Sequence, residues 1–182
     1  MTQTNDAPKL MPSGLSRAVI SRYGEDIAKS LGYRTGDPVE ILISDLGGKL
    51  SYSPKVFTGT GDAESIIVRA EDDFDVVLGT MTSPGRDRFT MCHELGHLFV
   101  HYPLFRERHP LTVMTAQRWV DDADPDQRRA EWEANWFSSA FLMPAEEFRK
   151  AADTDTDLAL ARRFGVSLSC VQTRKKILGM AV

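Results

Sequence analysis

The chain has 182 residues, of which 42% are hydrophobic and 26% are charged, a balance typical of a globular domain with a buried core. Its formal net charge of −4 and pI near 5.6 do not favour a broad phosphate-binding surface, so nucleic acid is not the expected partner. The two cysteines, Cys92 and Cys170, lie far apart, and the chain has neither a signal-peptide core nor an apolar run of about 18 residues. We therefore expect a cytoplasmic protein with free thiols and no membrane partner.

The chain is expected to begin with a tail and a helix. Residues 1–13 are polar and contain two prolines, which predicts a flexible N-terminal tail. A helix should follow, because apolar residues recur at a spacing of four and Gly32 can end it. The residues at this spacing are Leu15, Val19, Tyr23, Ile27 and Leu31.

The segment DPVEILISDLGG, residues 37–48, can be interpreted as a strand or as a helix. Its apolar residues alternate from Val39 to Ile43, as they do in a strand. However, Asp37 can cap a helix and Pro38 suits the first helical position. We therefore predict a short helix.

Three short segments rich in β-branched or aromatic residues predict three strands: KLSYSP (49–54), SIIVRA (65–70) and DVVLGT (75–80). The last of them could present an edge along which an extended substrate pairs. From Arg86 onward, residues again recur at helical spacing, and they predict a helix that ends at Pro103. This helix carries the sequence HELGH. The expected fold is α+β, with a small three-stranded sheet and an HExxH helix.

Residues 104–127 are expected to form a loop, with a little helix near residues 113–120. The next segment, QRRAEWEANWFSSAFLMP (127–144), predicts a second long helix that carries glutamates and ends at Pro144.

The main domain is placed at residues 14–148, followed by a C-terminal helical segment at residues 149–182. Within that segment, LARRFGVSLSCVQTRKKIL has a residue pattern typical of a helix-turn-helix. Gly165 would form the turn, and Ser167 would cap the second helix.

The sequence HELGH, residues 93–97, suggests a metal site in a chain with four histidines. On a helix, His93 and His97 lie one turn apart on the same face, so both imidazoles can reach one zinc ion at about 2.0–2.1 Å. Glu94 is turned by about 100° around the axis, where it can address a metal-bound water without being a ligand. This arrangement predicts metal-dependent hydrolysis.

His101 follows His97 by one further turn. In a regular helix it would lie about 12 Å along the axis from His93, which is too far for both to bind one ion. We therefore interpret His101 as a C-terminal histidine that binds the last carbonyls of the helix.

Zinc needs a third protein ligand, and EWEAN, residues 131–135, offers two carboxylates. On a helical wheel, Glu131 and Asn135 border the inward face, whereas Glu133 points away from Glu131. We predict Glu131 as the ligand and Asn135 as the partner that orients a histidine, with Glu133 as the fallback ligand. Trp132 and Trp136 should pack on the first helix or on the loop after residue 103 rather than contact substrate.

Together these segments resemble the ImmA/IrrE family of metallopeptidases, whose pattern is roughly RFTxAHELGH followed by ExxANxFAxxLLMP. This chain has RFTMCHELGH (88–97) and EWEANWFSSAFLMP (131–144), and a looser similarity covers about residues 15–148. Cys92 and the serines of FSSAFLMP depart from the pattern without touching the proposed ligands. The resemblance implies a zincin-like fold of the gluzincin type, zinc held by two histidines and a glutamate, and endoproteolysis of a helix-turn-helix repressor.

In the expected mechanism, zinc lowers the pKa of its bound water to around 7, and Glu94 takes the proton and delivers it to the leaving amine. Candidates for a donor to the tetrahedral oxyanion are Tyr102, His109 and Arg86. Manganese, iron or cobalt would also suit a His/His/Glu site.

The alternative is a non-catalytic zinc-containing regulator, or a toxin–antitoxin component, that binds a partner or DNA through the C-terminal segment. From Leu158 onward this segment has five Arg or Lys residues and no acid, which would suit DNA. Residues 121–157, however, contain eleven acidic and four basic residues. The basic residues after Leu158 can therefore serve to offset this negative charge within the protein. We therefore expect packing or substrate docking rather than direct DNA binding. A closed four-ligand zinc site would favour the alternative, but Cys92, the nearby thiol, is turned about 100° from His93.

Overall fold

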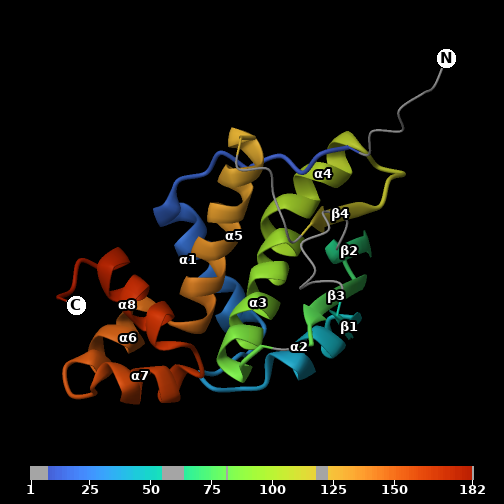
Figure 1. The fold of residues 1–182 in the computed structure, drawn as a ribbon. Helices are drawn as coiled ribbons and strands as arrows, with labels where there is room; N and C mark the ends of the chain where they lie inside the picture. The colour runs from blue at the N-terminus through green and yellow to red at the C-terminus, as the bar shows by residue number, and fades with distance from the viewer. Residues whose placement is uncertain (1–7, 55–63, 81, 118–122, 182) are drawn as a thin grey trace.

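The computed structural model describes residues 8–54, 64–80, 82–117 and 123–181. The helices are α1 (Arg17–Ser30), α2 (Val39–Asp45), α3 (Pro84–Gly96), α4 (Tyr102–Arg108), α5 (Pro125–Leu142), α6 (Ala145–Ala152), α7 (Asp157–Phe164) and α8 (Leu168–Ile177). The strands are β1 (Gly48–Ser53), β2 (Glu64–Ala70), β3 (Asp73–Gly79) and β4 (Met114–Gln117). In Figure 1, α3 stands between the small sheet and α5, with α1 behind α5 and with α6, α7 and α8 at the far side from the sheet. The fold is therefore of the mixed α+β class. None of the helices in the described ranges is long and apolar enough to cross a membrane.

The sheet has four strands in the order β1-β3-β2-β4, which corrects the predicted three. The additional strand, β4, lies where a loop with a little helix is predicted. Met114 and Ala116 of β4 are buried, and they alternate with Thr115 and Gln117. An alternation over four residues is too short to predict a strand from the sequence. These residues form a strand because they pair with β2.

The predicted free edge at DVVLGT is also wrong, because this segment forms β3 in the interior of the sheet. β3 pairs in parallel with β1 and antiparallel with β2. The edge strand next to β2 is β4, which pairs antiparallel with it. Any extended peptide that joins this side of the sheet must therefore meet β4.

Helix α1 is confirmed, but its buried face differs from the predicted one. Leu15, Val19 and Tyr23 are 45%, 50% and 38% exposed. The face that packs on α5 is centred on Gly24, where an added Cβ would lie 2.8 Å from the carbonyl oxygen of Phe137. The absent side chain lets the two backbones approach, and this contact rather than the apolar spacing sets the rotation of the helix.

Pro103 does not end the HELGH helix, contrary to the prediction. After α3, a π-helical turn spans His97–His101, and α4 continues through Pro103. Proline has no N–H to give to the carbonyl of Phe99, and the hydroxyl of Tyr23 reaches that oxygen instead, at 3.5 Å. The wide turn therefore accommodates the proline and changes the direction of the side chains that follow residue 97.

The predicted helix at residues 37–48 is present, and near the C-terminus α7 and α8 are joined by a turn at Gly165. α2 begins after Pro38, and no side chain caps it. Gly165 has a φ of +63°, and the hydroxyl of Ser167 accepts a bond from the N–H of Cys170 at 3.3 Å. The predicted boundary at 148/149 lies within α6, where the ring of Phe148 packs on that of Phe164 at 5.3 Å.

Candidate metal centre

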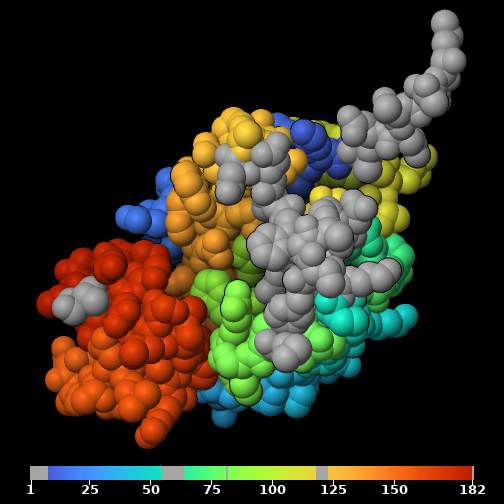
Figure 2. Space-filling model, viewed as in Figure 1, coloured from blue at the N-terminus to red at the C-terminus, as the bar shows by residue number. Residues whose placement is uncertain are grey.

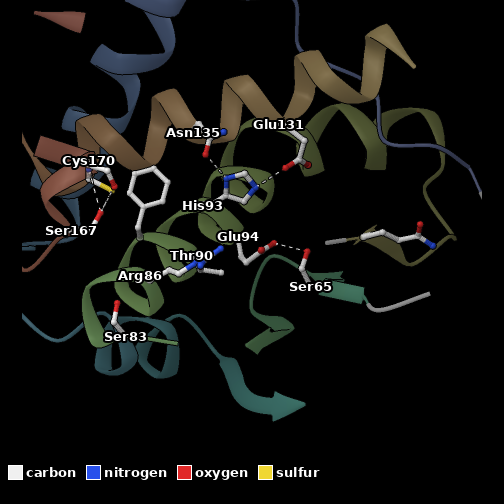
Figure 3. Close-up of a pocket in the computed structure, with 13 residues that line it drawn as sticks. Ser65, Ser83, Arg86, Thr90, His93, Glu94, Glu131, Asn135, Ser167 and Cys170 are labelled. Atoms are coloured by element: carbon white, nitrogen blue, oxygen red, sulfur yellow. Dashed lines mark hydrogen bonds and ion pairs between the residues drawn. The ribbon is translucent and has the colours of Figure 1, made fainter. Parts of the chain in front are cut away.

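A close crossing of α3 and α5 brings the two motif segments together. A Cβ added at Gly96 would lie 3.0 Å from the Cα of Ala134, so glycine at this position lets the helix backbones touch. Ala134 lies between Glu131 and Asn135 in the sequence, and the crossing therefore places both of these side chains against His93 (Figure 3). The small residue within HELGH is thus explained by helix packing.

His93, His97 and Glu131 converge on one point. Nε2 of His93 lies 3.1 Å from Nε2 of His97 and 3.1 Å from Oε2 of Glu131. Nε2 of His97 lies 3.2 Å from Oε1 of Glu131. In a tetrahedral zinc site with bonds of about 2.0–2.1 Å, neighbouring donor atoms are separated by about 3.3 Å. The donor chemistry and the spacing of these three side chains therefore fit a single metal ion.

The protonation states of this cluster are set by burial and by mutual contact. Burial lowers the pKa of His97 to about 4, against the opposing effect of Glu131, so its imidazole is neutral near pH 7. Burial raises the pKa of Glu131, but hydrogen bonds with His93 and His97 outweigh this effect and lower it. Burial likewise lowers the pKa of His93, and the neighbouring Glu131 and Glu94 carboxylates raise it overall. An ionised carboxylate and neutral imidazoles are the forms that bind a metal, so metal binding would favour the deprotonated form of His93.

Asn135 and Glu94 flank His93 on different sides. Oδ1 of Asn135 lies 3.0 Å from Nδ1 of His93, which leaves Nε2 directed at the point of convergence. Glu94 is 2% exposed, and one of its carboxylate oxygens accepts a hydrogen bond from Ser65 at 3.0 Å. Ser65 begins the buried part of β2 and had no distinguishing sequence signal. Figure 3 shows Glu94 reaching toward Ser65 from the helix that carries His93.

His101 does not bind the helix carbonyls as predicted, because the π-helical turn directs it inward. It is 1% exposed, and its Nδ1 lies 3.1 Å from Nδ1 of His97. Its Nε2 lies 3.1 Å from Oε2 of Glu133. One assignment of the protons satisfies both of these hydrogen bonds. Nδ1 of His97 donates to Nδ1 of His101, and Nε2 of His101 donates to Oε2 of Glu133. This assignment leaves the Nε2 lone pair of His97 free for a metal.

Glu133, the fallback ligand, is fully buried and faces the N-terminal segment instead of the point of convergence. The N–H and the hydroxyl of Ser13 donate to its Oε2 at 2.7 and 2.8 Å. The N–H of Gly14 and Nε of Arg129 donate to Oε1 at 3.1 and 2.9 Å. Burial raises the pKa of Glu133, but the bonds from His101, Arg129 and Ser13 lower it to about 2. The last residue of the predicted tail is thus bound to the protein; residues 1–7 lie outside the described part of the chain.

A cleft of about 570 Å³ opens in front of His93, Glu94 and Glu131. The C-terminal segment supplies one wall: in Figure 3, Ser167 and Cys170 lie at the opposite end of the cleft from Ser65. The contact is close because Gly85 of α3 has no Cβ, which would lie 3.1 Å from the backbone of Val166. Figure 2 accordingly shows the C-terminal helices, orange to red, forming a continuous surface with the green helix α3.

Of the three candidate oxyanion donors, the cleft includes Arg86 among its described lining residues but neither Tyr102 nor His109. Tyr102 is 3% exposed, and its hydroxyl donates to the carbonyl of Arg69 at 3.1 Å. His109 lies at the end of α4, with its ring 5.0 Å from that of Phe105. Helix α4 occupies Tyr102–Arg108, where a loop is predicted from residue 104, and neither side chain lines the cleft.

The two cysteines are free thiols in different environments. Cys92 is fully buried in the core on α3, and burial raises its pKa. Cys170 is partly exposed and lines the cleft. Among the described residues, the cluster that can hold a metal ion consists of His93, His97 and Glu131, and it includes neither thiol.

Fold and site together define an α+β protein with a candidate mononuclear metal centre on its HExxH helix. The chain belongs to the family of the IrrE N-terminal-like domain, Peptidase_M78, a metallopeptidase family whose sequence model matches residues 74–176. Among solved structures, a Mycobacterium tuberculosis transcriptional regulator shares the fold, with a TM-score of 0.56 and 24% sequence identity. The similarity covers 86% of this chain but 46% of that regulator. A comparison with curated proteins found no match.

Proposed function

We propose that this protein is a metal-dependent endopeptidase, with zinc, or manganese or another divalent ion, held by His93, His97 and Glu131. The chemistry of two imidazoles and a carboxylate supports this ligand set, and their donor atoms lie 3.1–3.2 Å apart. When bound, the metal would polarise the scissile carbonyl and acidify the attacking water. The two free thiols are consistent with a cytoplasmic protein.

The observation that carries the proposal is the position of Glu94. Its carboxylate lines the cleft beside the donor atoms but does not belong to the cluster that can hold the ion. A purely structural metal site has no need of such a group. We assign Glu94 the role of general base and acid: it takes a proton from water as the water attacks the peptide carbonyl, and it then gives that proton to the leaving amine nitrogen. Ser65 holds the carboxylate in place for both transfers.

The remaining polar residues of the site position the reacting groups. Asn135 orients His93, and the bonds from His97 through His101 to Glu133 orient His97. Arg86 is the candidate donor to the developing oxyanion, since it lines the cleft and carries a permanent positive charge.

We propose a protein substrate that belongs to the helix-turn-helix repressors. The metallopeptidase family supports a polypeptide substrate, and the cleft opens beside the edge strand β4, whose Gln117 is one of its lining residues. An extended segment of the repressor could pair with β4 and so present its peptide bond to the centre.

A DNA-binding role for the C-terminal segment has less support, because three of its five basic residues from Leu158 onward form bonds within the protein. Arg174 is 1% exposed, donates to the carbonyl of Met143 at 2.9 Å and pairs with Glu25 at 3.1 Å. Arg163 and Lys175 form ion pairs with acids of the same segment. We therefore assign this segment to the wall of the cleft.

The test is a comparison of native protein with Glu94→Gln in cells that also express helix-turn-helix repressors encoded beside its gene. Zinc content is measured on both purified proteins, and new protein N-termini are identified by mass spectrometry. We expect equal metal content and cleavage by the native protein alone. Cleavage that persists in Glu94→Gln would contradict the assigned mechanism, and metal-loaded native protein that generates no new N-terminus would contradict the peptidase function.

A further inference from the structure

A second, smaller cavity adjoins the metal cleft between α5 and α8. It has a volume of about 280 Å³, several times the roughly 30 Å³ that a water molecule occupies in the liquid. Its apolar walls include Phe89, Trp132, Trp136 and Ile177. Trp132 and Trp136, predicted to pack on the first helix or on the loop after residue 103, both line this cavity. Trp132 is 52% exposed, and Trp136 lies under the guanidinium of Arg129 at 4.7 Å.

The cavity and the metal cleft share part of their lining. Phe89, Asn135 and Cys170 border both, and Asn135 is in direct contact with the imidazole of His93. The two spaces are therefore adjacent. A peptide whose scissile carbonyl lies at the metal centre can place a neighbouring side chain directly in this cavity.

The wall of the cavity also includes a hydroxyl that has no hydrogen-bond partner among the described residues. Ser139 lines it, is 5% exposed, and its hydroxyl is a buried polar atom without a hydrogen bond in the described structure. The neighbouring Ser138 differs, because its hydroxyl donates to the carbonyl of Phe89 at 3.0 Å. An unmatched buried hydroxyl is costly, and a ligand group that pairs with it would recover that cost.

We propose that this cavity is a specificity pocket for a large aromatic substrate side chain next to the scissile bond, and that it favours tyrosine or tryptophan over phenylalanine. The apolar walls accept the ring through stacked or edge-to-face contacts. The hydroxyl of Ser139 pairs with the phenol or indole group that phenylalanine lacks. This inference rests on the proposed peptidase function, because it assumes that the adjoining centre holds the peptide.

Binding of hydroxamates tests the pocket separately from catalysis, since a hydroxamate binds an open zinc site directly. The probes are the hydroxamates of N-acetyl-tyrosine, N-acetyl-phenylalanine and N-acetyl-glycine, titrated calorimetrically into zinc-loaded protein. We expect the phenylalanine probe to bind at least about tenfold more tightly than the glycine probe. The tyrosine probe should gain a further two- to tenfold, roughly the effect of one hydrogen bond.

Two variants assign these preferences to residues. Ser139→Ala removes the unpaired hydroxyl without creating a new polar group, and it should abolish the tyrosine preference while leaving the phenylalanine affinity unchanged. Trp132→Ala should weaken both aromatic probes relative to glycine. As a second readout, an aromatic probe should slow the labelling of Cys170, which lines the pocket, whereas the glycine probe should not.

The outcomes separate the two proposals. Equal binding of the three probes, or a tyrosine preference that survives Ser139→Ala, would overturn the pocket and leave the metal centre intact. If no probe binds zinc-loaded protein, the open metal centre fails, and the pocket inference fails with it.

Discussion

Glu133 offers the sharpest test of how the fold supports the centre. Glu133→Gln keeps the size and shape of the side chain but replaces one acceptor oxygen by an NH₂ donor. In the native protein Oε1 faces two donors, from Gly14 and Arg129, and Oε2 faces the two donors of Ser13 together with Nε2 of His101. Whichever way the amide is placed, at least two donors lose their acceptor.

The expected loss of stability follows from the pKa. The pKa of Glu133 falls from an ordinary 4.5 to about 2, and at about 1.4 kcal/mol per tenfold change this difference corresponds to about 3 kcal/mol. The side chain is completely buried, so solvent screening does not reduce this figure. Because the folded pKa lies below the unfolded value, the contribution is present above about pH 4.5 and is lost as the pH falls toward about 2.

The assay is urea unfolding of metal-free protein between pH 7 and pH 3. We expect Glu133→Gln to be less stable than the native protein by about 3 kcal/mol at pH 7, and we expect this difference to shrink at the acid end. Glu71→Gln is the matched control, because Glu71 is 72% exposed in its pair with Arg106 and should change stability by less than about 1 kcal/mol. A Glu133→Gln variant as stable as this control, or a difference that does not depend on pH, would refute the reasoning.

Three further predictions follow from contacts around the centre. Gly96→Val should force α3 and α5 apart at Ala134, lowering stability by about 1–3 kcal/mol and weakening zinc binding; unchanged zinc affinity in a competition titration would contradict the close crossing. His101→Phe keeps an aromatic ring but removes both nitrogens, and it should weaken zinc binding about 10- to 100-fold, so an unaltered affinity would show that His97 needs no such partner. With a thiol reagent, native protein should react at Cys170 alone, and Cys92 should react only after unfolding; two fast-reacting thiols in native protein would contradict the burial of Cys92.

The sequence by itself determined the features that depend on local spacing. A helix places residues four apart on one face, and this brings the His93 and His97 side chains together and sets Glu131 beside Asn135. The turn at Gly165 and the cap at Ser167 are likewise local, because each is satisfied by atoms within a few residues. The family pattern rests on the same segments, which is why both motifs were recognisable without coordinates.

Tertiary structure decided the features that join distant segments. Ser13 and Glu133 are 120 residues apart, and Ser65 and Glu94 are 29 apart, yet each pair is hydrogen-bonded. No periodicity links such positions, because their contact depends on how the helices and strands pack. The same holds for β4, which becomes a strand only by pairing with β2, and for the cavity beside the cleft, whose walls come from three different helices. Local spacing fixes which side chains a helix presents together, but only packing decides what those side chains meet.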